Sequence, residues 1–113
     1  IGMNVGFASL FFANNLNVEK VISFEPFQFT YLDALVNFSL NQHSSKKISH
    51  YNFGLGLNNR KVRMSYSSHL KGKNTILREE AEGVEIELRS AIEVFDRILI
   101  ENSEHSFFVK MDC

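Results

Sequence analysis

The sequence has little cysteine, almost no net charge and no long hydrophobic run, and each of these absences removes a class of protein. Its 113 residues contain one cysteine, Cys113, so no intrachain disulfide can form and the chain fits a reducing compartment. The formal net charge is -1, so the sequence shows no excess of basic residues that would favour binding to nucleic acid or to an anionic membrane. No apolar run approaches the roughly 20 residues that span a bilayer.

What remains is an ordinary globular composition, with 44% hydrophobic and 22% charged residues. A chain of this length, without internal repeats or low-complexity linkers, forms one domain at most. Residues 5–13 are apolar, but no basic segment precedes them, and Gly2, Asn4 and Gly6 interrupt their start, so they do not read as a signal peptide. We therefore expect a cytoplasmic protein.

Helix-like and strand-like patterns alternate along the chain and predict an α/β fold. The short apolar run at 20–25 is typical of a strand covered on both faces. Ser90, with Glu93 three residues later, predicts an N-cap and a capping box. The expected helices are 5–15, 28–42 and one opened by Ser90; the expected strands are 20–25, 48–53, 61–66, 84–88 and 106–111, with Ile1 as the end of another.

The same patterns predict buried faces and turns. Polar loops are expected at 41–47 and 67–74. Gly54 and Gly56 are expected to end the strand 48–53, which would form a hairpin with the strand 61–66. The helix 28–42 is expected to bury one apolar stripe, made of Tyr31, Leu32, Leu35, Val36 and Leu40.

The opening residues carry the clearest chemical signal. A glycine-rich turn leads into a helix and then a strand that ends in Glu25, which is the first half of a nucleotide-type site. If Gly2 began a dinucleotide fingerprint, Asn4 would place a side chain at the pyrophosphate and Phe7 a bulky ring where the helix must pack closely. NAD or FAD binding is thus disfavoured, and no Gly-Lys-Ser or Gly-Lys-Thr follows to make a P-loop.

The pattern Gly-x-Asn-x-Gly suits a cofactor without phosphates, such as S-adenosylmethionine. Its methionine carboxylate can lie near the amides of a helix N-terminus, and Asn4 tolerates an unusual backbone conformation while offering a polar side chain. Glu25 ends the next strand, where an acidic side chain meets both ribose hydroxyls. Each feature also has a purely structural interpretation, and their joint occurrence is what favours a site.

Three segments, residues 1–10, Phe24-Glu25-Pro26 and residues 109–113, together resemble the FkbM-type family of S-adenosylmethionine-dependent methyltransferases. The family shows Asp-(Ile/Val)-Gly-Ala-Asn-x-Gly-x-x-(Ser/Thr), then Phe-Glu-Pro, then Lys-(Ile/Met)-Asp-x-Glu-Gly. Met3 replaces the alanine, and the first aspartate and the final Glu-Gly are absent. The resemblance implies O-methylation of a hydroxyl on a sugar, glycan or natural product.

The resemblance also implies a Rossmann-like class I methyltransferase sheet of strand order 3-2-1-4-5-7-6. The chain would hold strands two, three and four but only the last residue, Ile1, of strand one, so the first strand and the C-terminal strands are missing. Strand one lies between strands two and four, which leaves a gap in the sheet unless those two pair directly. We therefore expect a partial domain that does not transfer methyl groups by itself.

By the same resemblance, Gly2, Asn4 and Gly6 line the methionine end of the cofactor, and Glu25 holds the ribose. These positions match the family motif residue by residue.

The resemblance places Pro26 and Phe27 near the adenosine, and Asn52 and Phe53 beside the adenine. Asp112 would lie near the transferred methyl, where it is the candidate base for a hydroxyl acceptor. It can equally be a structural or cofactor-side residue. Methyl transfer otherwise asks mainly for alignment of acceptor and methyl group.

Two other functions stay open. A non-catalytic Rossmann-like domain could keep the fold and bind a nucleoside or a partner, and an NAD-dependent oxidoreductase is disfavoured by Asn4 and Phe7. No metal site is expected, because the histidines lack metal-ligand spacing with Cys, Asp or Glu. These histidines are His43, His50, His69 and His105.

Overall fold

The protein is described by a computed structural model that covers residues 1–64 and 83–112. The predicted loop 67–74, the end of the strand 61–66, His69 and Cys113 lie outside these residues. The elements in chain order are α1 (Phe7–Ala13), β1 (Val21–Phe24), α2 (Gln28–Leu40), α3 (Gln42–Ser45), β2 (Ile48–Tyr51), β3 (Gly54–Gly56), β4 (Arg60–Met64), β5 (Val84–Ser90) and α4 (Ala91–Glu101).

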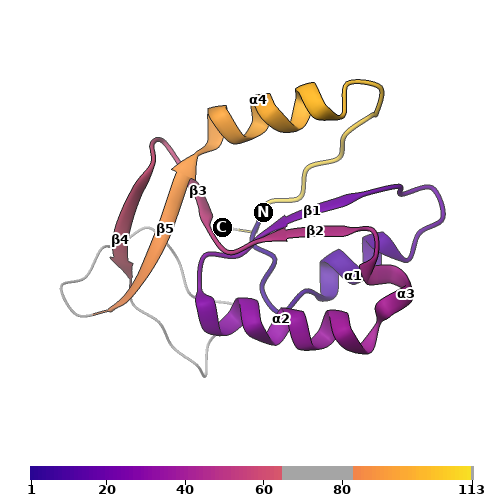
Figure 1. Cartoon of the computed structure of the whole chain (residues 1–113), viewed down its shortest axis with the longest axis horizontal. Helices are drawn as coiled ribbons and strands as arrows, with labels where there is room; N and C mark the ends of the chain where they lie inside the picture. Colours follow the sequence, from indigo (N-terminus) through magenta and orange to yellow (C-terminus); the bar gives the residue numbers. More distant parts are fainter. Residues whose placement is uncertain (65–82, 113) are drawn as a thin grey trace.

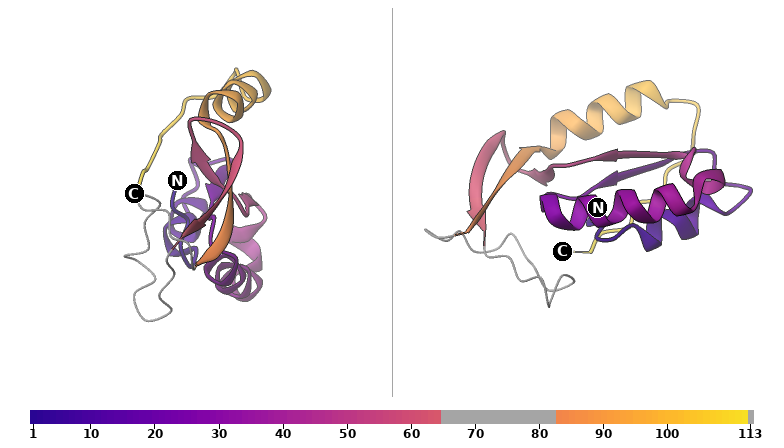
Figure 2. Two further views of the ribbon diagram at one scale, coloured as in Figure 1. Left: turned by 90° about the vertical axis from the view of Figure 1, so that its left-hand side faces the viewer. Right: turned by 60° about the horizontal axis from the view of Figure 1, so that its bottom comes forward.

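Two small sheets form the framework, and the α/β prediction is confirmed. In the first sheet, β1 and β2 run parallel, with Val21 opposite Ile48 and Phe24 opposite Tyr51. Helices α1 and α2 lie on one face of this sheet and α4 lies on the other (Figures 1 and 2). The second sheet has the order β3-β5-β4 and runs across the direction of the first (Figure 1).

Each sheet has its own apolar core. The first core lies where α1 and α2 pack against the first sheet, and it comprises Met3, Ala13, Ala34, Phe38 and Ile48. The core of the second sheet comprises Phe27, Val62, Met64, Ile86 and Leu88. Burial of a large apolar side chain contributes about 1.5–3 kcal/mol, so each cluster stabilises the sheet on which it packs.

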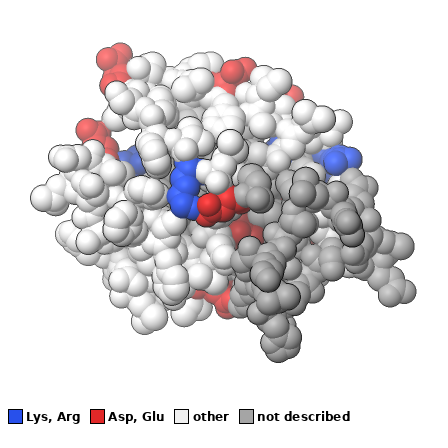
Figure 3. All heavy atoms as spheres, turned by 180° about the vertical axis from the view of Figure 1, so that it is seen from behind, with Lys and Arg blue, Asp and Glu red and all other residues white. Residues whose placement is uncertain are grey.

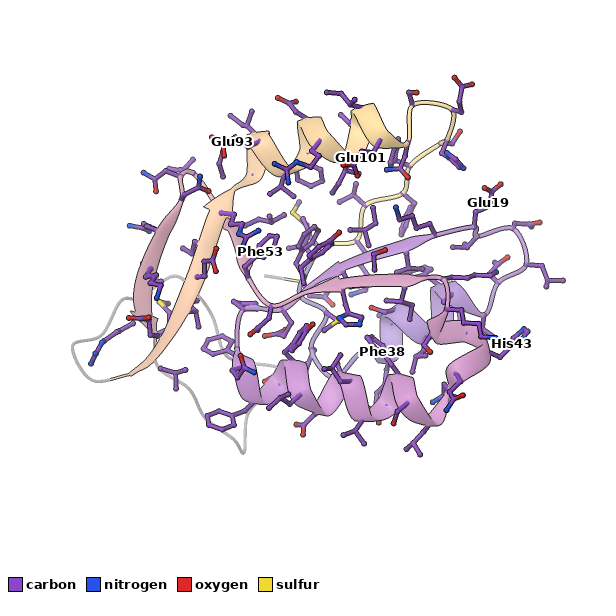
Figure 4. The ribbon with its side chains drawn as sticks, viewed as in Figure 1. Glu19, Phe38, His43, Phe53, Glu93 and Glu101 are labelled. Carbon is purple, nitrogen blue, oxygen red and sulfur yellow. The ribbon has the colours of Figure 1, made fainter. Side chains whose placement is uncertain are left out.

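The predicted buried stripe of α2 is correct only in part. Its members Tyr31 and Leu35 pack against the first core, whereas Leu32, Val36 and Leu40 are exposed. The fully buried residues of α2 are Thr30, Ala34 and Phe38, at a spacing of four residues. The Gly6 turn packs closely on this face: the Cβ of an alanine at Gly6 would lie 2.6 Å from the Phe38 ring and 3.3 Å from Ala34. Figure 4 shows Phe38 pointing from α2 toward the sheet.

The hairpin predicted from Gly54 and Gly56 is wrong. These glycines do not end the sheet but form β3, which pairs in parallel with β5. β4 pairs with β5 in the antiparallel direction, and β2 pairs with β1 in the first sheet, so the two strands expected to form the hairpin lie in different sheets. Glycine suits this position because a Cβ at Gly54 would lie 2.8 Å from the Leu88 side chain.

Other boundaries also differ from the predictions. α1 is shorter than the predicted 5–15, and the predicted loop 41–47 contains α3. The predicted strand 106–111 is not part of either sheet; the Ile1 nitrogen donates to its Lys110 O, and the Phe108 ring packs on Phe12.

The N-cap at Ser90 is confirmed, since the Glu93 amide donates to Ser90 Oγ at 3.4 Å. The reciprocal half of the capping box is replaced by Asn59. Its Oδ1 accepts from the Ser90 amide at 2.8 Å, and its Nδ2 donates to Glu93 Oε2 at 3.1 Å. The turn before β4 is therefore hydrogen-bonded to the start of α4.

Within the described part of the chain, no helix is long and apolar enough to cross a membrane. In the described part of the face that Figure 3 shows, most side chains are uncharged, and a positive and a negative side chain touch near its middle.

We expect Gly6→Ala to lower the free energy of unfolding by about 2–5 kcal/mol, because of backbone strain and overpacking. Gly6 has a φ of 85°, and the added methyl would lie 2.6 Å from the Phe38 ring. Urea denaturation checks this. Gly56→Ala is the control: its Cβ meets Leu88 at an ordinary 3.5 Å, so stability should change by less than about 1 kcal/mol. Equal losses in both variants would contradict the explanation.

Candidate functional site

The carboxyl ends of β1 and β2 meet the opening turn and residues 110–112 at one edge of the first sheet. The Met3 amide donates to Phe24 O at 2.8 Å, and the Asp112 amide donates to Ile1 O at 3.2 Å. The Asn52 side-chain amide donates to Glu25 O at 2.8 Å. The structure thus brings the opening turn, Glu25, Asn52 and Asp112 to the sheet edge where α/β proteins bind ligands.

The opening turn has three residues in the left-handed region. The φ angles are 75° at Gly2, 51° at Asn4 and 85° at Gly6. Asparagine is one of the few residues besides glycine that adopts this conformation readily. The Gly6 amide donates to Met3 O at 3.0 Å and closes the turn directly before α1.

Protein packing explains both glycines of this turn. A Cβ at Gly2 would lie 2.4 Å from the Asp112 carbonyl oxygen, and a Cβ at Gly6 would meet the Phe38 ring. Their predicted contacts with the methionine end of a cofactor stay a prediction.

Glu25 links the turn to the sheet. Its side chain is buried, its Oε2 accepts from the Asn4 amide at 2.9 Å, and its Oε1 accepts from the Phe27 amide at 3.0 Å. An ionised carboxylate has about four acceptor positions, so each oxygen keeps one position beyond its backbone bond. Burial raises the pKa of Glu25, and the bonds from the Phe27 and Asn4 amides offset part of that rise.

The side chain of Asn4 has an unusual environment. Its Oδ1 atom is buried and has no hydrogen-bond partner among the described residues. An unsatisfied buried acceptor of this kind costs about 1–3 kcal/mol. A donor held in the turn beside Glu25 would remove this cost.

The residues predicted to lie near the adenosine are mainly packing residues. Phe27 is buried in the core of the second sheet. Phe53 lies at the junction of the two sheets (Figure 4), where its ring packs on Phe24 and Tyr51 and the Arg89 guanidinium lies 4.1 Å from its centroid. Their predicted contacts with adenosine stay a prediction.

The Asn52 side chain is in contact with the backbone of Pro26. The Asn52 Nδ2 atom donates to Pro26 O at 3.3 Å in addition to its bond with Glu25 O. This amide therefore holds the strand end that carries the Glu25 carboxylate.

Asp112 lies against the opening turn, but its carboxylate is exposed and paired with the Lys110 ammonium. Sequence reasoning missed this pairing. The signal was available, because residues two apart in an extended segment share a face. Lys110 competes with any substrate hydroxyl for the Asp112 carboxylate, so the ion pair must open before Asp112 acts as a base.

Two further polar pairs were missed because their members are distant in the sequence. Ser9 and Ser23 hydroxyls lie 2.8 Å apart between α1 and β1, and Tyr31 Oη lies 2.7 Å from His50 Nδ1. Burial raises the pKa of Tyr31. In residues 1–64 and 83–112, no three His, Cys, Asp or Glu side chains gather in a way that could hold a metal ion.

Comparisons with protein-family models, with curated proteins and with solved structures give no significant match to this chain. Its function is therefore inferred from its own residues.

We expect the stability of the protein to depend on pH through Glu25. Because its pKa in the folded state lies above the ordinary 4.5, the folded state binds the proton more tightly than the unfolded chain. The stabilisation is therefore fully present below about pH 4.5 and is lost as the pH rises through the raised pKa. Glu25→Gln removes this titration.

Urea denaturation of wild type and Glu25→Gln between about pH 4 and about pH 7 measures the effect. The difference in unfolding free energy, wild type minus variant, should decrease as the pH rises. Glu101→Gln, at the exposed end of α4 (Figure 4), is the control, and an equal trend in this variant would show that the effect is not specific to Glu25. A difference that does not change with pH for Glu25→Gln would rule out the raised pKa.

Proposed function

We propose that this chain binds S-adenosylmethionine at the carboxyl edge of β1 and β2, as the cofactor-binding part of an O-methyltransferase of the class I, Rossmann-like type. The acceptor is a hydroxyl on a sugar, glycan or natural product. The observation that carries the proposal is the buried, unpartnered Asn4 Oδ1 in the turn held by Glu25.

The donor groups of S-adenosylmethionine match the free acceptors of this turn. Its α-ammonium would donate to Asn4 Oδ1, and its ribose hydroxyls would donate to the positions left on the two Glu25 oxygens. Each hydrogen bond that involves a charged group contributes about 1.5–3 kcal/mol. The sheet edge also offers no phosphate cradle, because Asn4 occupies the position where a pyrophosphate would need glycine.

When bound, S-adenosylmethionine supplies an electrophilic methyl group. The chain's own residues have simpler tasks. Asn4 and Glu25 orient the ligand, and the tightly packed Gly2 keeps Asp112 against the turn. Asp112 is the candidate group to take the proton of the acceptor hydroxyl. The ion pair between its carboxylate and Lys110 has to open first.

A second candidate is a non-catalytic domain that keeps the turn for structural reasons. It is favoured by the bonds that Glu25 already makes to the Asn4 and Phe27 amides, and by the protein atoms that face Gly2 and Gly6. These contacts account for the motif without a ligand, but not for the buried Asn4 Oδ1.

Isothermal titration of the chain with S-adenosylmethionine, S-adenosylhomocysteine and NAD separates the candidates. We expect binding of the first two. Asn4→Gly keeps the backbone freedom that a φ of 51° requires and removes only the side chain, so affinity should fall about 10- to 100-fold while stability is kept.

Asn58→Gly, in the exposed turn before β4, is the matched control and should bind as wild type does. Absence of binding to either adenosyl compound would support the non-catalytic domain instead, and binding of NAD alone would identify an oxidoreductase.

A further inference from the structure

The outer face of α2 carries a row of apolar side chains that are exposed. Their spacings are three and four residues, so they lie on one side of the helix and form a continuous stripe. Their exposed fractions run from 46% to 76%. This outer stripe consists of Phe29, Leu32, Val36 and Leu40.

Helix α2 is thus apolar on two opposite sides. Its inner side packs on the first sheet through Ala34 and Phe38. Figure 1 shows that its other side faces away from both sheets. Apolar side chains all round a helix are typical of one that is covered all round, and a contiguous exposed apolar patch marks an interaction surface.

The charges of α2 distinguish between the possible occupants of the outer stripe. The helix has 13 residues with one charged side chain, Asp33, and no lysine or arginine. A helix that binds a membrane surface carries Lys and Arg on its polar face. A partner held by opposite charge would need charged groups to pair with. Homodimer interfaces are the more apolar class, with few charges at the core, so the stripe fits a second copy of the chain.

We propose that two copies of this chain associate through the outer stripe, with their α2 helices packed antiparallel about a twofold axis. Such an axis brings the same surface of both copies together. In this arrangement Leu32 of one copy lies against Val36 of the other, and Phe29 lies against Leu40, so each contact occurs twice. The inference does not depend on the proposed function.

The antiparallel direction is favoured by Asp33 and by the helix dipoles. Asp33 directly follows Leu32 and lies beside the stripe. A parallel pair would set the two Asp33 carboxylates at the same level, where like charges repel, whereas an antiparallel pair staggers them along the helices. It also brings the partly positive N-terminus of each helix near the partly negative C-terminus of the other.

The size of the outer stripe sets the strength of the association. At 1.5 Å per residue, Phe29 and Leu40 are about 16 Å apart along the helix. A standard interface uses about 20–30 residues on each side, which is more than one helix face offers. We therefore expect a reversible dimer with a dissociation constant between about 10 µM and about 1 mM.

Sedimentation velocity over about 10 µM to about 1 mM tests this association. The wild type should shift from monomer to dimer as its concentration rises. Val36→Lys should weaken the dimer at least about tenfold, because it buries an unpaired charge in the interface. Ile92→Lys makes the same kind of change at an exposed residue of α4 and should dimerise as wild type does. A monomeric wild type, or a dimer retained in Val36→Lys, would overturn the proposal.

Two complementary variants test which residues face each other. Leu32→Glu and Val36→Lys should each stay monomeric alone, and circular dichroism checks that both remain folded. Their equimolar mixture should form a heterodimer, because the carboxylate introduced at position 32 then faces the ammonium introduced at position 36. A mixture that stays monomeric while the wild type dimerises would contradict the antiparallel pairing.

Cosedimentation with lipid vesicles tests a membrane as the other occupant. The wild type should not bind vesicles of phosphatidylcholine, with or without phosphatidylserine. Binding to either vesicle that is lost in Leu32→Glu would assign the outer stripe to a membrane and overturn the dimer.

Discussion

The two hydrogen bonds of the Glu25 carboxylate are the contact on which the arrangement of the sheet edge depends. One oxygen binds the amide of Asn4 in the opening turn, and the other binds the amide of Phe27 before α2. A single buried side chain thus joins the turn, β1 and α2. The free energy of burying this carboxylate opposes the arrangement, while the two amide bonds support it.

The turn itself shows how one motif can have two causes. The glycines at positions 2 and 6 are required by the Asp112 backbone and the Phe38 ring, whatever the chain binds. Asn4 is different, because its left-handed backbone explains a small polar residue but not a buried amide oxygen without a partner. The chemistry of the site is therefore better judged from the asparagine than from the glycines.

Local signals in the sequence predicted the local structure well. The apolar run of β1, the extent of α2 and the Ser90 cap each depend on neighbours within a few residues, and all three were found. Pairings between distant segments were not predicted. β5 lies between β3 and β4, and no pattern within residues 54–64 indicates this pairing.

The inner face of α2 was missed for a related reason. Hydrophobicity alone favours Leu32 and Val36, but the Gly6 turn packs against Ala34 and Phe38 instead. At the site, the sequence predicted which residues gather at the sheet edge. It did not show that Lys110 pairs with Asp112, or that Phe27 and Phe53 are packed within the protein.

The separate cores of the two sheets have a consequence for how damage spreads through the molecule. The first core is built from residues 3–48, and the second is built mainly from β4 and β5. Phe27 is the member of the second core that comes from the first half of the chain, and its amide donates to the Glu25 carboxylate. A change that loosens the β3-β5-β4 sheet would therefore reach the candidate site through Phe27.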